Sequence, residues 1–392
     1  MRVLFLSNLF PSHDEPVRGL DNATLLHALV NFTELEVRVI SPRPSLSARG
    51  EAAWLPRIQD ERLEPQFIPC PYVPKVGSLL NDRLMEHALR IPLKQAVEDF
   101  RPDGLLVSWL FPDGCAAASL ARALNLPVVL VTQGSDTHAY LGSRTRCRKI
   151  LRAIDRSRGV ICRSGDLADR LVQAGVSRSL LSIVYNGVDR EVFRYRGKSE
   201  TRASFGISVN EAVILFVGNL LPVKDPIFLI RAHAEWNRRR KAEGKPSGRL
   251  ILIGDGPLRS RVGRESRRLG SDHQVNLLGR LPAEIVSRWM NAADVLCLSS
   301  RNEGFPNVIL EALASELPVI TTDVGGIREK LAEGGGVLVH QGDLNSYVKA
   351  LTRAVEATQK DEFNQRKPGV ISAPPDWSST AARYREILEL AF

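Results

Sequence analysis

The alternation of short apolar runs with longer helical patterns most constrains what this 392-residue chain can fold into. Apolar runs such as 104–108 and 213–218 have the length of buried strands, whereas a stretch such as 81–100 repeats apolar residues at helical spacing. Strands that alternate with helices are typical of βαβ units and predict an α/β fold with parallel sheets. Because one hydrophobic core rarely serves a chain this long, we expect two doubly wound domains.

Two series of expected strands support this division. The first comprises residues 2–7, 36–41, 104–108, 127–132, 159–162 and 182–184, with helices expected at 22–30, 81–100, 114–124 and 166–174. The second comprises residues 213–218, 249–254, 275–279, 295–299, 318–321 and 337–340. The polar stretch 186–210 is predicted to be a linker that carries a hinge, and three prolines within 359–376 predict a tract without regular structure.

Composition narrows the class of protein. Hydrophobic residues make up 44% and charged residues 25%, which is typical of a globular chain, and no apolar run approaches the ~20 residues that span a bilayer. The first residues, MRVLFLSNLF, predict a strand and no signal peptide, so we expect a cytoplasmic protein. Five cysteines without C-x-x-C spacing predict reduced thiols, with neither a disulfide framework nor a metal site.

The formal charge of +9 is compatible with nucleic acid, an anionic membrane surface or an anionic substrate. Basic residues cluster at 144–158, 238–245 and 259–268. The second and third clusters are interpreted as solvated helix faces and helix ends. Two interpretations stay open for the first: a plain solvated surface, or a patch that holds the protein to anionic lipid.

The segment 302–326, NEGFPNVILEALASELPVITTDVGG, carries the most informative chemistry. Glu303 is expected in a loop, Pro306 at a helix start, and Glu311 inside that helix. The amides at a helix start and the helix dipole attract phosphate. Those expected to face an anion here belong to Phe305, Asn307, Val308 and Ile309.

Glu311 stands among apolar residues, where a buried carboxylate is costly unless it accepts hydrogen bonds, and ligand hydroxyls are suitable donors. A simpler interpretation remains beside this one. Glu303 is then an ordinary loop acid and Glu311 faces solvent, as most charged residues do.

The run E-G-F-P-N-V-I-L-E, followed by an expected strand and Gly325-Gly326, resembles the E-x7-E signature of retaining nucleotide-sugar glycosyltransferases of family 4. The resemblance extends over nearly the whole chain. It implies the GT-B architecture, with two Rossmann-like domains that face each other across a cleft. Residues 1–190 would bind the acceptor, residues 191–376 the nucleotide sugar, and a C-terminal helix at 377–392 would cross back to the first domain.

The same resemblance assigns residues that bind the donor. In VGNLLPVKD, Lys224 would neutralise the diphosphate as a catalytic residue, and Asn219 stands where many relatives have a second positive residue. LILIGDGP and LLGRLP resemble the strand ends on the nucleotide-base side, and Arg259 breaks the G-x-G-x-x-G pattern begun there. Glu303 would act on the sugar as the second catalytic residue. The donor-binding residues that the resemblance implies are Gly19, Asn219, Gly254, Gly256, Arg280, Gly304, Phe305, Asn307, Val308, Ile309 and Glu311.

Other residues are assigned to the sugar and acceptor side. Arg18 precedes Gly19 in the loop after the first strand, where backbone would approach an anion. In VTQGSDTHAY, Gln133 replaces the family's usual His and cannot shuttle a proton, while Asp136 is retained. His138 is assigned to the same side, with a satisfied loop histidine as the alternative.

These residues predict a metal-independent glycosyltransferase of the hexosyltransferase type, which moves a sugar from UDP or GDP to an acceptor hydroxyl with retention of configuration. No D-x-D occurs in the chain, and no cofactor is expected beyond the donor itself. The expected partners are a nucleotide-sugar donor and a glycan or lipid-linked acceptor, with an anionic membrane surface at the inner face if the acceptor is lipid-linked, and no nucleic acid. A nucleotide-sugar epimerase or a non-catalytic binding protein of the same architecture is the alternative.

Overall fold

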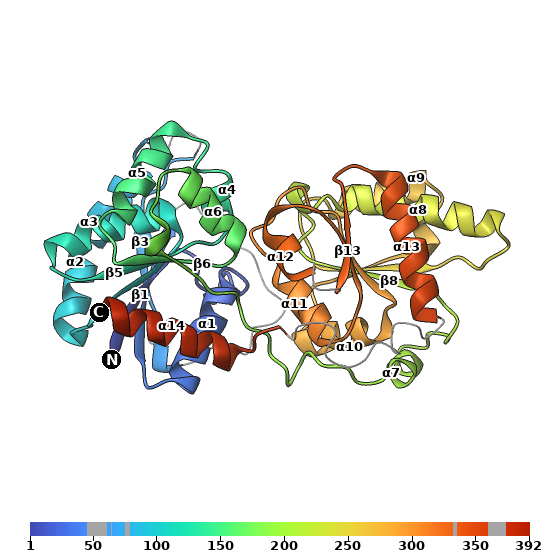
Figure 1. The fold of residues 1–392 in the computed structure, drawn as a ribbon, viewed down its shortest axis with the longest axis horizontal. Helices are drawn as coiled ribbons and strands as arrows, with labels where there is room; N and C mark the ends of the chain where they lie inside the picture. The colour runs from blue at the N-terminus through green and yellow to red at the C-terminus, as the bar shows by residue number, and fades with distance from the viewer. Residues whose placement is uncertain (45–60, 64, 75–78, 332–334, 360–373) are drawn as a thin grey trace. The chain divides into compact units, whose positions relative to one another are not determined.

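The computed structural model describes residues 1–44, 61–63, 65–74, 79–331, 335–359 and 374–392. The chain divides into two compact units (Figure 1). Unit 1 comprises Met1–Gly187 together with Pro375–Phe392, and unit 2 comprises Val188–Pro374. Part of the tract predicted to lack regular structure, residues 360–373, lies outside the described residues.

Unit 1 is built on a parallel sheet in the strand order β3-β2-β1-β4-β5-β6-β7. Its strands are β1 (Arg2–Leu6), β2 (Glu36–Pro44), β3 (Gln66–Cys70), β4 (Gly104–Ser108), β5 (Val128–Val131), β6 (Gly159–Cys162) and β7 (Leu181–Ile183). Its helices are α1 (Leu20–Phe32), α2 (Asn81–Phe100), α3 (Cys115–Ala123), α4 (Ser135–His138), α5 (Arg144–Ile154), α6 (Gly165–Gln173) and α14 (Trp377–Ala391). This confirms the predicted doubly wound architecture and adds β3, which sequence periodicity missed.

The two faces of the unit 1 sheet are covered by different helices, as strand geometry requires. Successive side chains of a strand point to opposite faces. In β1, Leu4 and Leu6 pack with α2, α3 and α5, whereas Val3 and Phe5 pack with α1 and α14. Helices α2, α3 and α5 therefore lie on one face, and α1 and α14 lie on the other (Figure 1).

The C-terminal helix α14 belongs to unit 1, as predicted. Its side chains Ala381, Tyr384 and Leu388 are buried in the core that α1 shares. The Thr380 hydroxyl donates to the Tyr185 carbonyl at 3.2 Å. Unit 1 is therefore completed by residues from both ends of the chain.

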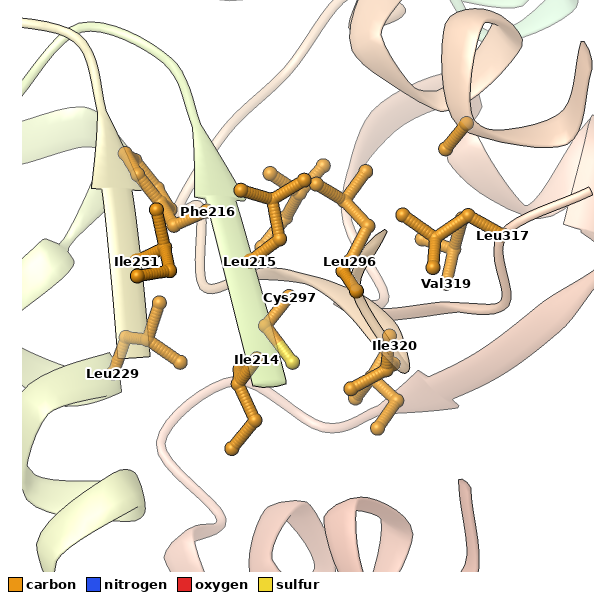
Figure 2. Packing of buried hydrophobic residues seen from close by; sticks show 14 of the residues in the cluster. Ile214, Leu215, Phe216, Leu229, Ile251, Leu296, Cys297, Leu317, Val319 and Ile320 are labelled. Atoms are coloured by element: carbon orange, nitrogen blue, oxygen red, sulfur yellow. The ribbon is translucent and has the colours of Figure 1, made fainter. Parts of the chain in front are cut away.

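Unit 2 is built on a second parallel sheet in the order β10-β9-β8-β11-β12-β13. Its strands are β8 (Val213–Val217), β9 (Arg249–Ile253), β10 (Val275–Gly279), β11 (Val295–Leu298), β12 (Val319–Thr322) and β13 (Gly336–Val339). Its helices are α7 (Lys198–Ser204), α8 (Pro226–Ala242), α9 (Arg259–Arg268), α10 (Ala283–Ala292), α11 (Asn307–Ala314), α12 (Arg328–Leu331) and α13 (Leu344–Gln359). Side chains from the central strands meet those of α8 in one continuous core (Figure 2).

The unit boundary after Gly187 falls within the predicted linker 186–210, but most of that stretch belongs to unit 2 and is no linker, while the hinge stays a prediction. It contains α7, and Val188, Phe193 and Ile207 are buried in the core of unit 2. Buried Asp294 anchors the segment by accepting hydrogen bonds from Lys198 at 2.5 Å and from Arg202 at 2.9 Å. The stretch is polar on average, and this average concealed three separated apolar residues that pack into the core of unit 2.

Several smaller findings complete the fold. The five cysteines are unpaired. None of the described helices combines the length and apolar character that crossing a membrane requires. The basic cluster at 259–268 is α9, and that at 238–245 ends α8, as expected for helix faces and ends. Arg240 is the exception, since it is buried and its guanidinium lies 4.7 Å from the centre of the Trp236 ring.

Candidate functional site

The carboxyl edge of the unit 2 sheet holds the residues predicted to be catalytic. Strand β8 lies between β9 and β11, so the chain winds away from β8 in both directions. Ligands of open α/β sheets bind at such a switch point, beside the carboxyl ends of the strands. The loop after β8 carries Lys224, and the loop after β11 carries Glu303.

Lys224 and Glu303 form an ion pair across this switch point. The Lys224 ammonium donates to Glu303 Oε1, which also accepts from the Ser300 hydroxyl at 2.6 Å. The two side chains are only 22% and 10% exposed, so the pair is shielded from bulk water. Sequence reasoning assigned the two residues separately, and the structure brings them into direct contact.

The two loops are fastened to each other by further hydrogen bonds. The Ser299 hydroxyl donates to the carbonyls of Lys224 at 3.1 Å and Asp225 at 2.9 Å. The Arg301 amide donates to the Val223 carbonyl at 2.7 Å, and the Arg301 guanidinium pairs with Asp225 at 2.8 Å. These contacts fix the backbone on both sides of the Lys224–Glu303 pair.

The loop of Glu303 is also held by the loop after β12. Gly325 has φ +59°, and a Cβ there would lie 1.8 Å from the Glu303 carbonyl oxygen. The Gly326 amide donates to the Gly304 carbonyl at 3.2 Å. Only glycine at position 325 therefore lets the two loops lie this close, because any side chain there would collide with the Glu303 carbonyl.

Helix α11 begins one residue later than the sequence suggested. Pro306 has extended dihedrals and precedes the helix, which starts at Asn307. The Ile309 amide donates to the Pro306 carbonyl at 3.0 Å. The expectation that the Ile309 amide faces an anion is therefore wrong, because the turn itself uses that donor.

Glu311 lies on α11 as predicted, half-buried between Leu310 and Ala312, which are fully buried. Burial raises its pKa from the ordinary 4.5 to about 7. Within the described residues, no side chain or backbone amide donates a hydrogen bond to its carboxylate. This arrangement is costly without a partner and suits a ligand that brings donors of its own.

Gly254 and Gly256, which were predicted to lie on the nucleotide-base side, are required by close contacts within unit 2. A Cβ on Gly254 would lie 2.0 Å from the Gly218 carbonyl oxygen, and one on Gly256 would lie 2.7 Å from that of Leu220. They let the loop after β9 pass against the loop after β8. Arg280, which follows β10, and Asn219 are both exposed, so neither is committed to the core.

Unit 1 has a switch point of its own, between β1 and β4. Arg18 lies in the loop after β1, where its guanidinium donates to the carbonyl and side-chain oxygens of Asn8, both at 2.8 Å, and pairs with Glu15 at 3.3 Å. Gly19 has φ +65°, and a Cβ there would lie 2.2 Å from the Leu9 backbone. Contact within its own loop is sufficient to require glycine at this position, and its approach to the donor stays a prediction.

Gln133 is joined to a buried polar network. Its side-chain nitrogen donates to Asn22 Oδ1 at 2.8 Å and to the Ser108 hydroxyl. The same Asn22 oxygen accepts from Arg163 at 2.9 Å. The side-chain nitrogen of Gln133 therefore serves the fold, although the residue stays half-buried at the surface.

Asp136 and His138 are both held by contacts within unit 1. Asp136 is fully buried and accepts from the amides of Leu110, Gln133 and Gly134 at 2.8–3.2 Å. Burial raises its pKa, and these amides oppose the shift. The His138 side chain is 3% exposed, and its Nε2 lies 3.2 Å from the Asp166 carboxylate. His138 therefore ends α4 beside a carboxylate of the same unit, and its part in sugar binding stays a prediction.

Sequence reasoning missed a cavity of about 390 Å³ in unit 1. It lies at the β1/β4 switch point, and its aromatic lining follows different strands. The rings belong to Tyr72 after β3, Trp109 and Phe111 after β4, and Tyr140 beyond α4. Arg146, within the cluster 144–158, also lines it, so that cluster is not a surface patch alone. Aromatic residues that follow strand ends were the available signal.

Comparison with known families decides the class. Residues 197–366 match the family described as "Glycosyl transferases group 1", and residues 23–192 match "Glycosyltransferase Family 4". An uncharacterized glycosyltransferase of Methanocaldococcus jannaschii is 30% identical over 76% of this chain and 78% of its own length. The chain belongs to glycosyltransferase family 4.

Other members and solved structures of this glycosyltransferase class extend the match. A Bacillus subtilis protein named as a teichuronic acid biosynthesis glycosyltransferase, TuaC, is 28% identical over 90% of this chain and 89% of its own length. The Anabaena protein HepE, solved with UDP-glucose, matches all of both chains with a TM-score of 0.76 at 20% identity. The second likeness establishes the GT-B fold of this family 4 enzyme.

Proposed function

We propose that this glycosyltransferase moves a hexosyl group from a nucleoside diphosphate to an acceptor hydroxyl, with retention of configuration and without a divalent metal. The observation that carries the proposal is the Lys224–Glu303 pair at the switch point of unit 2, with Glu311 nearby on α11. Solved structures of HepE with UDP and with UDP-glucose support a nucleotide-sugar donor, and make UDP the first nucleotide to test.

Lys224 would bind the donor diphosphate. Its ammonium is preorganised by the fastened loops and is only partly exposed, so its field acts in a site of low dielectric. The positive end of the α11 dipole lies in the same loop system. As the bond from the sugar to phosphate breaks, negative charge grows on the diphosphate, and Lys224 would stabilise it.

Glu303 and Glu311 would bind different parts of the donor, Glu303 the transferred sugar and Glu311 the ribose. Glu303 uses Oε1 for Lys224 and Ser300, which leaves Oε2 to meet a sugar hydroxyl or the positive charge that develops on the ring. Glu311, a carboxylate without a donor in the described residues, would accept from the ribose hydroxyls. Both acids then act through hydrogen bonds and charge, and neither needs to become a nucleophile.

The transfer step follows from this division. The acceptor oxygen attacks the anomeric carbon from the face that the diphosphate leaves. The bond between that carbon and the phosphate oxygen breaks, the new glycosidic bond forms, and the proton of the acceptor hydroxyl passes to the departing phosphate. Attack on the same face retains the configuration.

A proton NMR time course tests the reaction. The enzyme is given UDP-glucose and candidate acceptors, with and without EDTA, and the anomeric signal of the first product is recorded. We expect the donor's configuration and equal rates in both samples. An inverted initial product would refute retention, and activity restored specifically by Mg²⁺ or Mn²⁺ would refute the metal-free diphosphate site. If UDP-glucose binds but no UDP is released from it, the chain would be a binding protein without transferase activity.

We further propose that the enzyme works in polysaccharide or glycolipid assembly, at a membrane surface. Arg144, Arg148 and Arg152 are exposed at a spacing of four residues, so they share one face of α5. Leu79 and Leu80 are exposed, and the Leu79 carbonyl accepts from Lys149 of the same helix at 3.1 Å. Arginines beside exposed leucines are suited to an anionic bilayer surface.

Vesicle sedimentation tests the surface. We expect binding to vesicles that contain phosphatidylglycerol and none to phosphatidylcholine alone. Replacing the three exposed α5 arginines by glutamine should abolish binding. The control replaces Arg261, Arg264 and Arg267, which are exposed on α9 and remove the same charge. Equal losses in the two triple variants would show that net charge alone is responsible.

A further inference from the structure

The cavity of unit 1 has a chemical character that the transferase reaction does not by itself explain. It is built at the carboxyl edge of the sheet, from segments that follow β1, β3, β4 and β5. Its volume of about 390 Å³ falls within the range of small-molecule sites. Four aromatic rings line it together with the polar side chains of Asn8, Arg18, Asn81 and Arg146.

The rings form a rigid group. Tyr140 lies edge-on to both Trp109 and Phe111, with ring centres 6.2 Å and 6.1 Å apart. Trp109 has φ +86°, a conformation that costs free energy in any residue but glycine. Its amide donates to the Val131 carbonyl at 3.0 Å, and its carbonyl accepts from Gly114 at 2.9 Å. The fold therefore holds a strained tryptophan at the cavity, as is common at ligand sites.

Arg146 is the unusual polar group of the cavity. Its guanidinium lies 4.4 Å from the centre of the Tyr140 ring and 5.7 Å from that of Phe111. Its Nε is buried without a hydrogen-bond partner, and no carboxylate among the described residues pairs with it.

Neighbouring cations differ from Arg146 in this respect. Arg18 pairs with Glu15 at 3.3 Å, and Lys149 pairs with Asp82 at 2.5 Å. Their charges are already balanced within the protein. Arg146 alone of these three cations retains a charge that faces the cavity without a protein counter-ion.

We propose that this cavity binds the acceptor, and that the acceptor is a sugar that carries an anionic group beside an apolar ring face. The inference rests on the proposed transferase function and specifies its acceptor. The C–H face of the ring packs against Trp109 and Tyr140, and the anion forms a forked pair of hydrogen bonds with Arg146. The ligand thereby supplies the counter-ion that the protein lacks.

Two carriers of the anion share this chemistry, namely the carboxylate of an acidic sugar and the phosphate ester of a sugar phosphate. Isothermal titration of the full chain with glucuronic acid, glucose 1-phosphate and methyl glucoside separates them. Both anionic ligands should bind at least ~10-fold more tightly than the neutral glucoside, on the scale of one charge-assisted pair. Whichever of the two anionic sugars binds more tightly identifies whether the acceptor carries a carboxylate or a phosphate ester.

The variant Arg146→Gln should remove this preference and leave all three ligands equally weak, whereas Arg146→Lys should restore part of it. Arg122→Gln is the matched control, because Arg122 is exposed on α3 of the same unit, outside the cavity. Circular dichroism shows whether each variant is folded. Equal affinity of the unaltered chain for charged and neutral sugars, or equal effects of the Arg146 and Arg122 variants, would overturn the proposal.

A separate titration distinguishes this failure from failure of the transferase function. UDP should bind through residues of unit 2, so Arg146→Gln should leave UDP affinity unchanged. If UDP binds and the anionic sugars do not, the acceptor class is wrong and the transferase proposal survives. If neither the anionic sugars nor UDP and GDP bind, both proposals fail.

Discussion

The Lys224 ammonium donates to the Glu303 carboxylate and thereby neutralises, within the protein, the charge that a diphosphate would otherwise meet. Donor binding then has to share or replace this ion pair. The two residues are separated by 79 positions, and their meeting depends on the adjacency of β8 and β11. Because only Glu303 pairs with Lys224, we expect removal of Glu303 and removal of Glu311 to affect nucleotide binding differently.

Removal of Glu303 should not weaken binding of free UDP. The variant Glu303→Ala releases Lys224 from its partner, so UDP affinity should stay equal or increase while turnover falls. Glu311→Ala should instead weaken UDP itself, because the ribose is present in the nucleotide and the sugar only in the donor. Calorimetric titration of both variants with UDP measures this, and equal losses would show that the roles are misassigned.

Lys224→Ala should slow the chemical step by roughly 10²-fold or more, the usual scale for one lost stabiliser of developing charge. Lys349→Ala on α13 is the control, since that lysine is exposed and lies outside the switch point. Single-turnover kinetics with UDP-glucose report the step. Near-normal turnover in the Lys224 variant would identify it as a surface charge with no catalytic part.

Glu311 should make the folded state less stable as pH rises. Its carboxyl titrates near 4.5 in the unfolded chain and near 7 in the folded protein, so the unfolded chain loses its proton first. Stability is lost between these pH values and is constant above them. Glu311→Gln should therefore be more stable than the unaltered chain by about 1–2 kcal/mol at pH 8, and by little at pH 4.5. Urea unfolding at the two pH values measures the difference, and a gain independent of pH would contradict it.

Gly325→Ala should destabilise unit 2 and reduce turnover together, because its Cβ would collide with the Glu303 carbonyl. Gly342→Ala is the matched control. Gly342 also has positive φ, but no atom lies within 4 Å of its added Cβ. The control should lose about 1–2 kcal/mol from backbone strain alone, and Gly325→Ala should lose more. Equal shifts of the unfolding midpoint would show that the loop yields to the methyl group.

The sheets were predictable because central strands such as β4 and β8 are buried on both faces and so appear as continuous apolar runs. Strand β3 was missed because it is an exposed edge strand that contains Pro69. Residue types and local spacing indicated Glu303, Glu311 and Lys224 as candidates. The contact between Lys224 and Glu303 depends on strand order, which periodicity does not encode.

The roles of Asp136 and the cavity could not be predicted for a related reason. An aspartate at this position is compatible with ligand binding and with a structural role in a loop, and the sequence does not distinguish these roles. The three amides that donate to Asp136 in the structure indicate the structural role. Trp109 follows β4, Tyr140 follows α4, and Arg146 lies within α5. Their convergence is a property of the folded sheet.

The return of α14 to unit 1 makes unit 2 an insertion within a discontinuous domain. The chain leaves unit 1 after Gly187 and rejoins it at Pro375, where Gly187 lies against the backbone of Trp377. A truncation at residue 374 would therefore strip a helix from the core of unit 1. An excised 188–374 fragment would instead keep its whole sheet together with Lys224, Glu303 and Glu311. If these residues bind the nucleotide as proposed, that function could be encoded by one uninterrupted stretch of the gene, whereas unit 1 needs both ends of the chain.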